Sequence, residues 1–225
     1  MAHERVLILA GGCWPKAGLP AGILREADFV IAADGGWAKA REHQIPVDLV
    51  VGDLDSLSEG EADALAGSGI KIRVFPQAKD RTDLEIALDY ALSLGATRVV
   101  IIGALGGRLD HTLANISLLE KAARAGAAIQ IEGEEERAFV VTDRLCLEEA
   151  AKGDVVSLLA LSETVDGIRT KGLTFPLKHE SLARSSSRGV SNVVSSVPAQ
   201  IKIEKGLLLV VHQAREHSRN PFRAC

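Results

Sequence analysis

The feature that most constrains the fold is a regular alternation of short apolar runs with helical patterns, which extends over roughly the first 130 residues. Most of the apolar runs are continuous, as in strands that helices cover on both faces. Strands that alternate with helices at this spacing are typical of βαβ units, so the sequence predicts a parallel sheet. The expected strands are residues 6–10, 29–33, 49–52, 70–75, 98–103 and 127–132.

The clearest helix of this region is expected over residues 82–94. Its apolar side chains recur at i, i+3, i+4, i+7 and i+8 from Leu84, which is the spacing of a helix face that packs on a core. Thr82 and Glu85 have the spacing of a capping box, in which each side chain bonds the backbone of the other residue. We therefore expect the helix to begin directly after Thr82.

The pattern changes after the Glu-rich segment 132–137, because the apolar runs that follow have no long helices between them. Strands are expected at 139–141, 155–161, 165–170, 201–204 and 207–212. Glycine and serine punctuate this region as turn residues do, and Pro176 and Pro198 favour strand ends.

Together these patterns predict an α/β protein with two domains. Residues 1–135 are expected to form a Rossmann-like open, mainly parallel sheet with helices. Residues 136–215 are expected to form an all-β sandwich, and residues 216–225, which have no apolar periodicity, a flexible tail.

Composition excludes several classes of function. A net charge of −4 and a pI of 5.9 provide no general attraction for nucleic acid or anionic lipid. Aromatic residues make up 4% of the chain, too few for the stacking platforms of single-strand binders. No apolar run approaches the ~18 residues of a membrane span. Cys13, Cys146 and Cys225 are far apart, so they predict neither disulfides nor a zinc site. We expect a cytoplasmic protein that binds neither nucleic acid nor membrane.

Carboxylates follow successive strands of the predicted parallel sheet. Asp34 follows the second strand, Asp53 and Asp55 the third, and Asp80 and Asp83 the fourth. Because the carboxyl ends of parallel strands meet at one edge of a sheet, we expect these acids to lie close together. Like charges at that distance need a compensating cation, and oxygen ligands favour Mg²⁺ or Mn²⁺. Each acid taken alone also fits turn or helix-start chemistry.

Basic and glycine residues occupy the same loops. Lys79 and Arg81 flank Asp80, and the glycine-rich segment 103–111 follows the fifth strand. Glycines let backbone N–H groups approach an anion, and the helix expected near Asp110 directs its positive end toward the same edge. Arg108 either binds phosphate oxygens or forms a salt bridge with one of these aspartates. His111 is at best a ligand contact. These loops predict a phosphate site.

Several familiar catalytic motifs are absent from the sequence. There is no G-x-x-x-x-G-K-[ST] and no complete G-x-G-x-x-G, which excludes an ordinary P-loop kinase and the usual dinucleotide site. There is also no G-x-S-x-G nucleophile elbow and no H-E-x-x-H. The chemistry still compatible with the sequence is metal-assisted phosphoryl transfer on a fold without a P-loop.

The ordered motifs of the chain resemble those of the thiamine pyrophosphokinase family, whose members transfer a diphosphoryl group from ATP to the hydroxyl of thiamine. They include Gly-Asp-Leu-Asp-Ser at 52–56, Lys-Asp-Arg-Thr-Asp at 79–83 and Gly-Gly-Arg-Leu-Asp-His at 106–111. The other segments of the resemblance are 9–12, 33–36, 46–48, 75–76, 103–105, Asn115, 172–177 and 189–192.

The resemblance implies a role for each site residue. Mg²⁺, with Mn²⁺ as an alternative, would be held by Asp53, Asp55 and Asp83, which with Arg108 and Asp110 form the catalytic set. ATP would lie against Asp34, Gly35, Gly36, Lys79, Asp80, Thr82, Arg108 and His111. Thiamine would face Asp110, Ser191 and Asn192. The first domain would then be catalytic, and the second would bind thiamine and form a homodimer whose partner completes the thiamine site.

Two other functions remain open from the sequence. The same site fits diphosphoryl transfer to another small alcohol, such as a pterin alcohol, because the acids specify phosphate and metal more firmly than the acceptor. The chain is also compatible with a non-catalytic nucleotide-binding module. If transfer occurs, we expect in-line attack on the β-phosphorus, with Asp83 or Asp110 as the proton acceptor.

Overall fold

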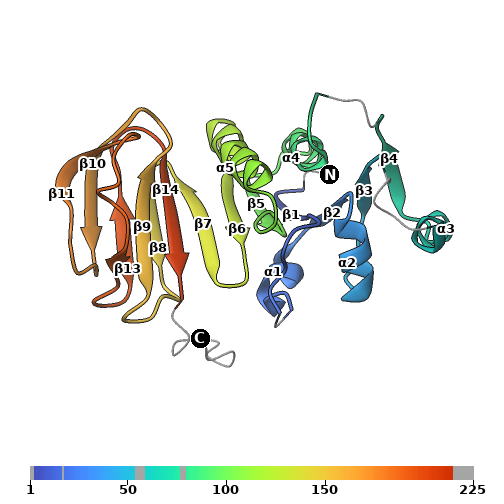
Figure 1. Cartoon of the computed structure of the whole chain (residues 1–225), viewed down its shortest axis with the longest axis horizontal. Coiled ribbons are helices and arrows are strands. Elements are labelled where there is room, and N and C mark those ends of the chain that lie inside the picture. The colour runs from blue at the N-terminus through green and yellow to red at the C-terminus, as the bar shows by residue number, and fades with distance from the viewer. Residues whose placement is uncertain (1–2, 17, 54–58, 77–79, 215–225) are drawn as a thin grey trace. The chain divides into compact units, whose positions relative to one another are not determined.

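A computed structural model describes residues 3–16, 18–53, 59–76 and 80–214. The chain divides into two compact units, Met1–Glu134 and Glu135–Cys225 (Figure 1). This boundary lies one residue before the expected one, which followed residue 135. Asp55, Lys79 and the expected tail 216–225 lie outside the described residues, so what we expect of them stays a prediction.

The first unit contains a sheet in which all paired strands are parallel. Its strand order is β6-β5-β1-β2-β3-β4. The strands are β1 (Arg5–Leu9), β2 (Phe29–Ala33), β3 (Leu49–Gly52), β4 (Lys71–Val74), β5 (Arg98–Ile102) and β6 (Ala128–Glu132). The mainly parallel sheet predicted from the sequence is confirmed. Its central strands are fully buried at positions such as Ile8, Ile31 and Ile101, as expected of continuous apolar runs.

Helices connect these strands. They are α1 (Ala21–Glu26), α2 (Gly36–Glu42), α3 (Glu59–Gly67), α4 (Asp83–Ser93) and α5 (Leu109–Arg124). The helix predicted over 82–94 is α4, which contacts β1, β2 and β3 and buries Leu84 and Leu88. Its N-cap is Thr82, whose Oγ1 accepts a hydrogen bond from the Glu85 N–H at 3.2 Å.

The order of the parallel strands reverses next to β1. The chain proceeds from β1 to β4 on one side, and β5 and β6 lie on the other side of β1. The loops that follow β1 and β5 therefore begin at a topological switch point, where open α/β sheets form their ligand crevices.

The second unit consists of two antiparallel sheets, with strand orders β12-β9-β14-β7 and β11-β10-β13-β8. The strands are β7 (Glu136–Val141), β8 (Arg144–Leu147), β9 (Val155–Ala160), β10 (Thr164–Lys171), β11 (Lys178–Ala183), β12 (Asn192–Val193), β13 (Ala199–Lys202) and β14 (Leu208–Gln213). Buried side chains from both sheets, among them Val156, Ile168 and Val210, form one hydrophobic cluster. The all-β character predicted for this region is confirmed.

Some strand positions in the second unit differ from the sequence prediction. The strand expected at 201–204 is β13, which starts two residues earlier, directly after Pro198. The strands β8, β11 and β12 were not predicted. In β11 only Leu182 is buried, so no apolar run marks it.

None of the helices within the described residues has the length and hydropathy of a membrane-spanning helix.

Candidate active site

The glycine-rich loops after β1 and β5 are bound to each other. The Gly12 N–H donates to the Gly103 carbonyl at 2.9 Å, and the Cys13 N–H donates to the Leu105 carbonyl at 2.9 Å. A Cβ atom on Gly103 would lie 2.2 Å from the Ala10 carbonyl oxygen. Since no side chain fits at that distance, glycine is required for the two backbones to meet here.

The loops after β2 and β3 reach the same edge of the sheet. The Asp34 N–H donates to the Val51 carbonyl at 2.8 Å, and a Cβ atom on Gly52 would lie 3.2 Å from the Asp34 Cα. Asp34 is thereby placed beside the residue that precedes Asp53. Gly36 approaches the Leu9 carbonyl so closely that a Cβ atom would lie 2.0 Å from its oxygen. The loops after β1, β2, β3 and β5 thus form one continuous rim.

Three of the expected acidic residues stand on elements that adjoin this rim. Asp34 and Asp53 follow β2 and β3, and Asp83 is the first residue of α4, which contacts β3. All three side chains are half-buried. Among the described residues, no group of three or more His, Cys, Asp or Glu side chains is close enough to hold a metal ion. Asp55 lies outside those residues, so the complete acidic set stays a prediction.

Arg108 and Asp110 form an exposed ion pair at the start of α5. Arg108 Nη2 lies 2.6 Å from Asp110 Oδ2, and Arg108 Nε lies 3.1 Å from Oδ1. The hydrogen bonds from Arg108 hold the pKa of Asp110 below its ordinary value, with a further contribution from the His111 N–H. Of the two interpretations of Arg108 from the sequence, the structure shows the salt bridge to an aspartate.

The remaining expected nucleotide residues are distributed along the same loops. Asp80 and His111 are exposed. Thr82 caps α4, so its hydroxyl oxygen already accepts one hydrogen bond, from the Glu85 N–H. Gly35 and Gly36 stand at the start of α2, with Gly35 at its N-cap.

Two polar side chains for which we predicted no role form hydrogen bonds with the glycine-rich loops. Lys39 Nζ donates to the Gly12 carbonyl at 2.6 Å, and Asn115 Nδ2 donates to the Ala104 carbonyl at 2.7 Å. Asn115 is one of the positions at which the sequence resembles the thiamine pyrophosphokinase family, and this resemblance could have pointed to it. Nothing in the sequence distinguishes Lys39 from other lysines on helix surfaces.

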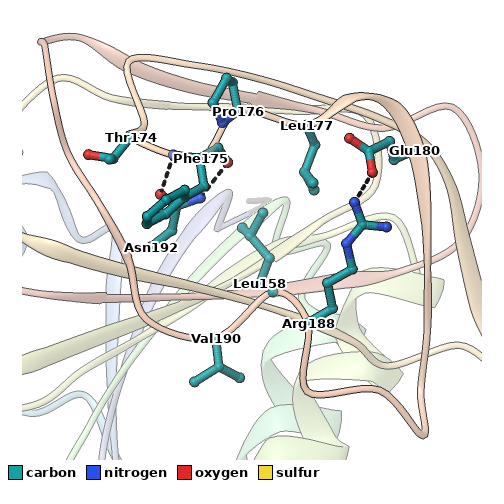
Figure 2. A pocket seen from close by; sticks show the side chains of 10 residues that line it. Leu158, Thr174, Phe175, Pro176, Leu177, Glu180, Arg188, Val190 and Asn192 are labelled. Carbon is teal, nitrogen blue, oxygen red and sulfur yellow. Dashed lines mark hydrogen bonds and ion pairs between the residues drawn. The ribbon is translucent and has the colours of Figure 1, made fainter.

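The second unit contains a pocket of about 390 Å³ around a different set of residues (Figure 2). Its lining residues are Leu158, Thr174, Phe175, Pro176, Leu177, Glu180, Arg188, Gly189, Val190 and Asn192. Gly189 meets β9 so closely that a Cβ atom would lie 2.1 Å from the Leu158 carbonyl oxygen. That close approach brings the segment before β12 to the pocket.

Asn192 is buried and fixes the backbone of Phe175. Its Oδ1 accepts from the Phe175 N–H at 3.1 Å, and its Nδ2 donates to the Phe175 carbonyl at 2.7 Å. Ser191 is exposed and has a φ of 60°, in the left-handed region that favours glycine. The Ser191 N–H donates to Ser157 Oγ at 3.0 Å. Of the residues expected to face thiamine, Asn192 therefore lines the pocket and fixes the backbone of Phe175, which also lines it.

Sequence models of one family match both units. The model described as "Thiamin pyrophosphokinase, catalytic domain" matches residues 21–131, and the model described as "Thiamin pyrophosphokinase, vitamin B1 binding domain" matches residues 143–208. The chain belongs to the thiamine pyrophosphokinase family. Membership makes it a transferase of the diphosphokinase type. The catalytic-domain match contains the rim of acidic and glycine residues from Asp34 onward, and the vitamin B1 binding match contains the pocket.

Individual thiamine pyrophosphokinases resemble this chain over nearly its whole length. The protein of Bacillus subtilis (strain 168) is 29% identical over 211 residues, which are 92% of this chain and 98% of the relative. The crystal structure of thiamine pyrophosphokinase from Bacillus subtilis superposes with a TM-score of 0.82 at 25% identity, covering 94% of this chain and 99% of that one. A family protein from Enterococcus faecalis gives 0.80 at 26% identity, covering 95% and 100%.

Proposed function

We propose that this thiamine pyrophosphokinase transfers the diphosphoryl group of ATP to the hydroxyl of thiamine, giving thiamine diphosphate and AMP. The main observation behind the proposal is that two different domain models of the family match the two units. The catalytic-domain model covers the loops where Asp34 and Asp53 meet the glycine-rich rim, and the vitamin B1 binding model covers the pocket beside Asn192. Each unit thus supplies one of the two sites that a two-substrate transfer needs.

The rim suits the phosphates of ATP. A glycine has no side chain to keep a phosphate group away from the backbone, and the N-terminal end of α5 adds a positive dipole. Asp53 and Asp83, with Asp55, would hold Mg²⁺ or Mn²⁺, because a donor set of carboxylate oxygens fits a hard divalent ion. When bound, the ion supplies positive charge against the phosphate oxygens.

The transfer step makes one bond and breaks one. The hydroxyl oxygen of thiamine attacks the β-phosphorus in line, the bond from that phosphorus to the oxygen bridging it to the α-phosphorus breaks, and AMP leaves. The hydroxyl proton passes to Asp83 or Asp110. While Arg108 holds the pKa of Asp110 low, Asp110 is a poor base. If Arg108 turns onto a phosphate oxygen, Asp110 becomes more basic.

Product analysis tests the proposal directly. Full-length protein with ATP, Mg²⁺ and thiamine should form AMP and thiamine diphosphate in equal amounts, and neither without thiamine. Formation of ADP would overturn the proposal in favour of an ordinary kinase. Transfer to a pterin alcohol instead of thiamine would identify a different acceptor, and retention of ATP without AMP release would identify a non-catalytic module.

A homodimer and a cytoplasmic location are also part of the proposal. The family resemblance supports the homodimer, and the wide separation of the cysteines supports the location. Sedimentation velocity tests the homodimer. A single species with the mass of one chain, at the concentrations where the enzyme is active, would contradict the dimer.

A further inference from the structure

The pocket of the second unit has two unlike walls. On one side stands the ring of Phe175, whose residue is 68% exposed. On the other side Glu180, from β11, forms an ion pair with Arg188, from the segment between β11 and β12 (Figure 2). Leu158 and Leu177 lie between these walls. The pocket therefore offers an aromatic face, an apolar lining and a carboxylate.

This combination suits a flat aromatic ring that carries a positive charge. An aromatic side chain stacks on such a ring and attracts its charge through the negative face of the π-system. The carboxylate of Glu180 provides the opposite charge on the other side. A neutral ring would gain the stacking on Phe175 and lose the attraction to Glu180.

Arg188 already occupies the position of a cation beside Glu180. The Arg188 side chain is 58% exposed and the Glu180 side chain 30%, and ion pairs at this exposure contribute little to stability because water competes for both partners. Glu180 has a second contact, since its Oε1 accepts from the Lys178 N–H at 3.3 Å. The carboxylate can therefore keep its orientation when Arg188 turns outward.

We propose that Glu180 binds the cationic ring of thiamine and that Arg188 is an internal counter-ion, which the substrate displaces. The proposal rests on the proposed function, because it takes thiamine as the ligand of the pocket. The thiazolium ring of thiamine carries a permanent positive charge. Glu180 then attracts the substrate while Arg188 competes with it, so the two members of one ion pair have opposite effects on affinity.

Calorimetric titration of the full chain tests this opposition. Binding of thiamine is compared with binding of its neutral isostere, in which a thiophene replaces the thiazolium ring. Both titrations contain Mg²⁺ and α,β-methylene-ATP, an ATP analogue that cannot release AMP. We expect Glu180→Gln to weaken thiamine binding about fivefold and to change binding of the isostere less than about twofold. Arg188→Gln should tighten thiamine binding about threefold. The double variant should bind thiamine as Glu180→Gln does.

Two matched variants control for the change in net charge. Glu163→Gln and Arg184→Gln alter exposed residues that are not among those lining the pocket, and they should leave both affinities unchanged. If Glu180→Gln and Arg188→Gln weaken both ligands alike, the pair only supports the fold and the proposal is wrong. Equal affinity of the wild-type chain for thiamine and the isostere would also overturn it. If the expected affinities are found but ATP and thiamine give no AMP, the proposed function fails and the assignment of the pocket stands.

Discussion

Asp53 directly follows β3 and is half-buried at the rim that Asp34 shares. Asp53→Asn keeps the shape of the side chain but removes the charge that a divalent ion requires. We expect turnover to fall by at least about a hundredfold, since electrostatic stabilisation of this kind carries most of phosphoryl transfer. The rate of thiamine-dependent AMP release measures the effect.

The matched control is Asp63→Asn, which alters an exposed aspartate on α3. It should leave turnover unchanged, and both variants should melt within about 2 °C of the wild type, because surface substitutions are close to neutral. Normal turnover in Asp53→Asn would remove Asp53 from the metal site.

The effect of Arg108 on Asp110 can be tested by titrating the Asp110 carboxyl group. Arg108 lowers the pKa of Asp110, so the pair stabilises the folded chain above the unfolded pKa of about 3.9 and loses that effect as the pH falls through the folded pKa. Arg108→Gln should return the pKa of Asp110 toward its ordinary value. The carboxyl carbon shift of Asp110, followed by NMR from pH 2 to 7, measures the change. An identical titration in wild type and variant would show that the pair does not persist in solution.

The sequence reveals site residues only where their chemistry is visible in the chain itself. Asp34 and Asp53 were predictable because carboxylates that follow parallel strands must share an edge. Glu180 and Arg188 were not, because their pairing depends on β11 and the segment after it folding around a pocket. In a strand-rich region, two opposite charges eight residues apart do not by themselves predict an ion pair.

At the scale of single elements, α4 shows how a local signal acts in its tertiary setting. Thr82 caps the helix as predicted, but the Glu85 side chain accepts from Lys121 Nζ of α5 at 3.0 Å. Thr82→Ala should therefore destabilise the chain by about 1 kcal/mol through loss of the cap. Urea denaturation measures the loss, and Thr82→Ser, which keeps the hydroxyl, should restore most of it. Equal stability of all three proteins would mean that the cap contributes nothing.

A buried contact between a histidine and an aspartate connects β14 with the turn before β9. His212 Nε2 lies 2.8 Å from Asp154 Oδ2, with side chains 6% and 2% exposed, and the same oxygen accepts from the Ala151 N–H at 2.8 Å. Asp154→Ala should cost about 3 kcal/mol, because it leaves buried donors without their acceptor. Thermal denaturation checks this against Asp143→Ala, an exposed aspartate, for which less than about 1 kcal/mol is expected. Equal losses would contradict a special role for the buried pair.

Predictability differs between the two units for a physical reason. In the first, most strands are apolar runs, and every predicted end lies within one residue of the observed strand. In the second, strands such as β11 and β12 are polar or very short, and hydrogen bonds to neighbouring strands define them. Such pairing joins residues distant in sequence, which a local pattern does not contain.

At the scale of the whole molecule, the division into two units predicts that each substrate protects a different set of backbone amides from hydrogen exchange. A ligand slows exchange most strongly where it contacts and orders the chain. Mg²⁺ with α,β-methylene-ATP should protect segments 34–37 and 103–112, which form the rim. Addition of thiamine should then protect 173–193, which contains most of the pocket lining.

Exchange measured by mass spectrometry on the full chain separates these effects from general stabilisation. Ala199–Lys202 of β13 serves as the internal reference, because this strand supplies none of the pocket lining and no part of the rim. Its exchange should change only as much as global stability changes. If thiamine leaves 173–193 as it was and protects the rim alone, the pocket is not its binding site. The division of the two substrates between the units would then be wrong, although the chain could still catalyse the transfer.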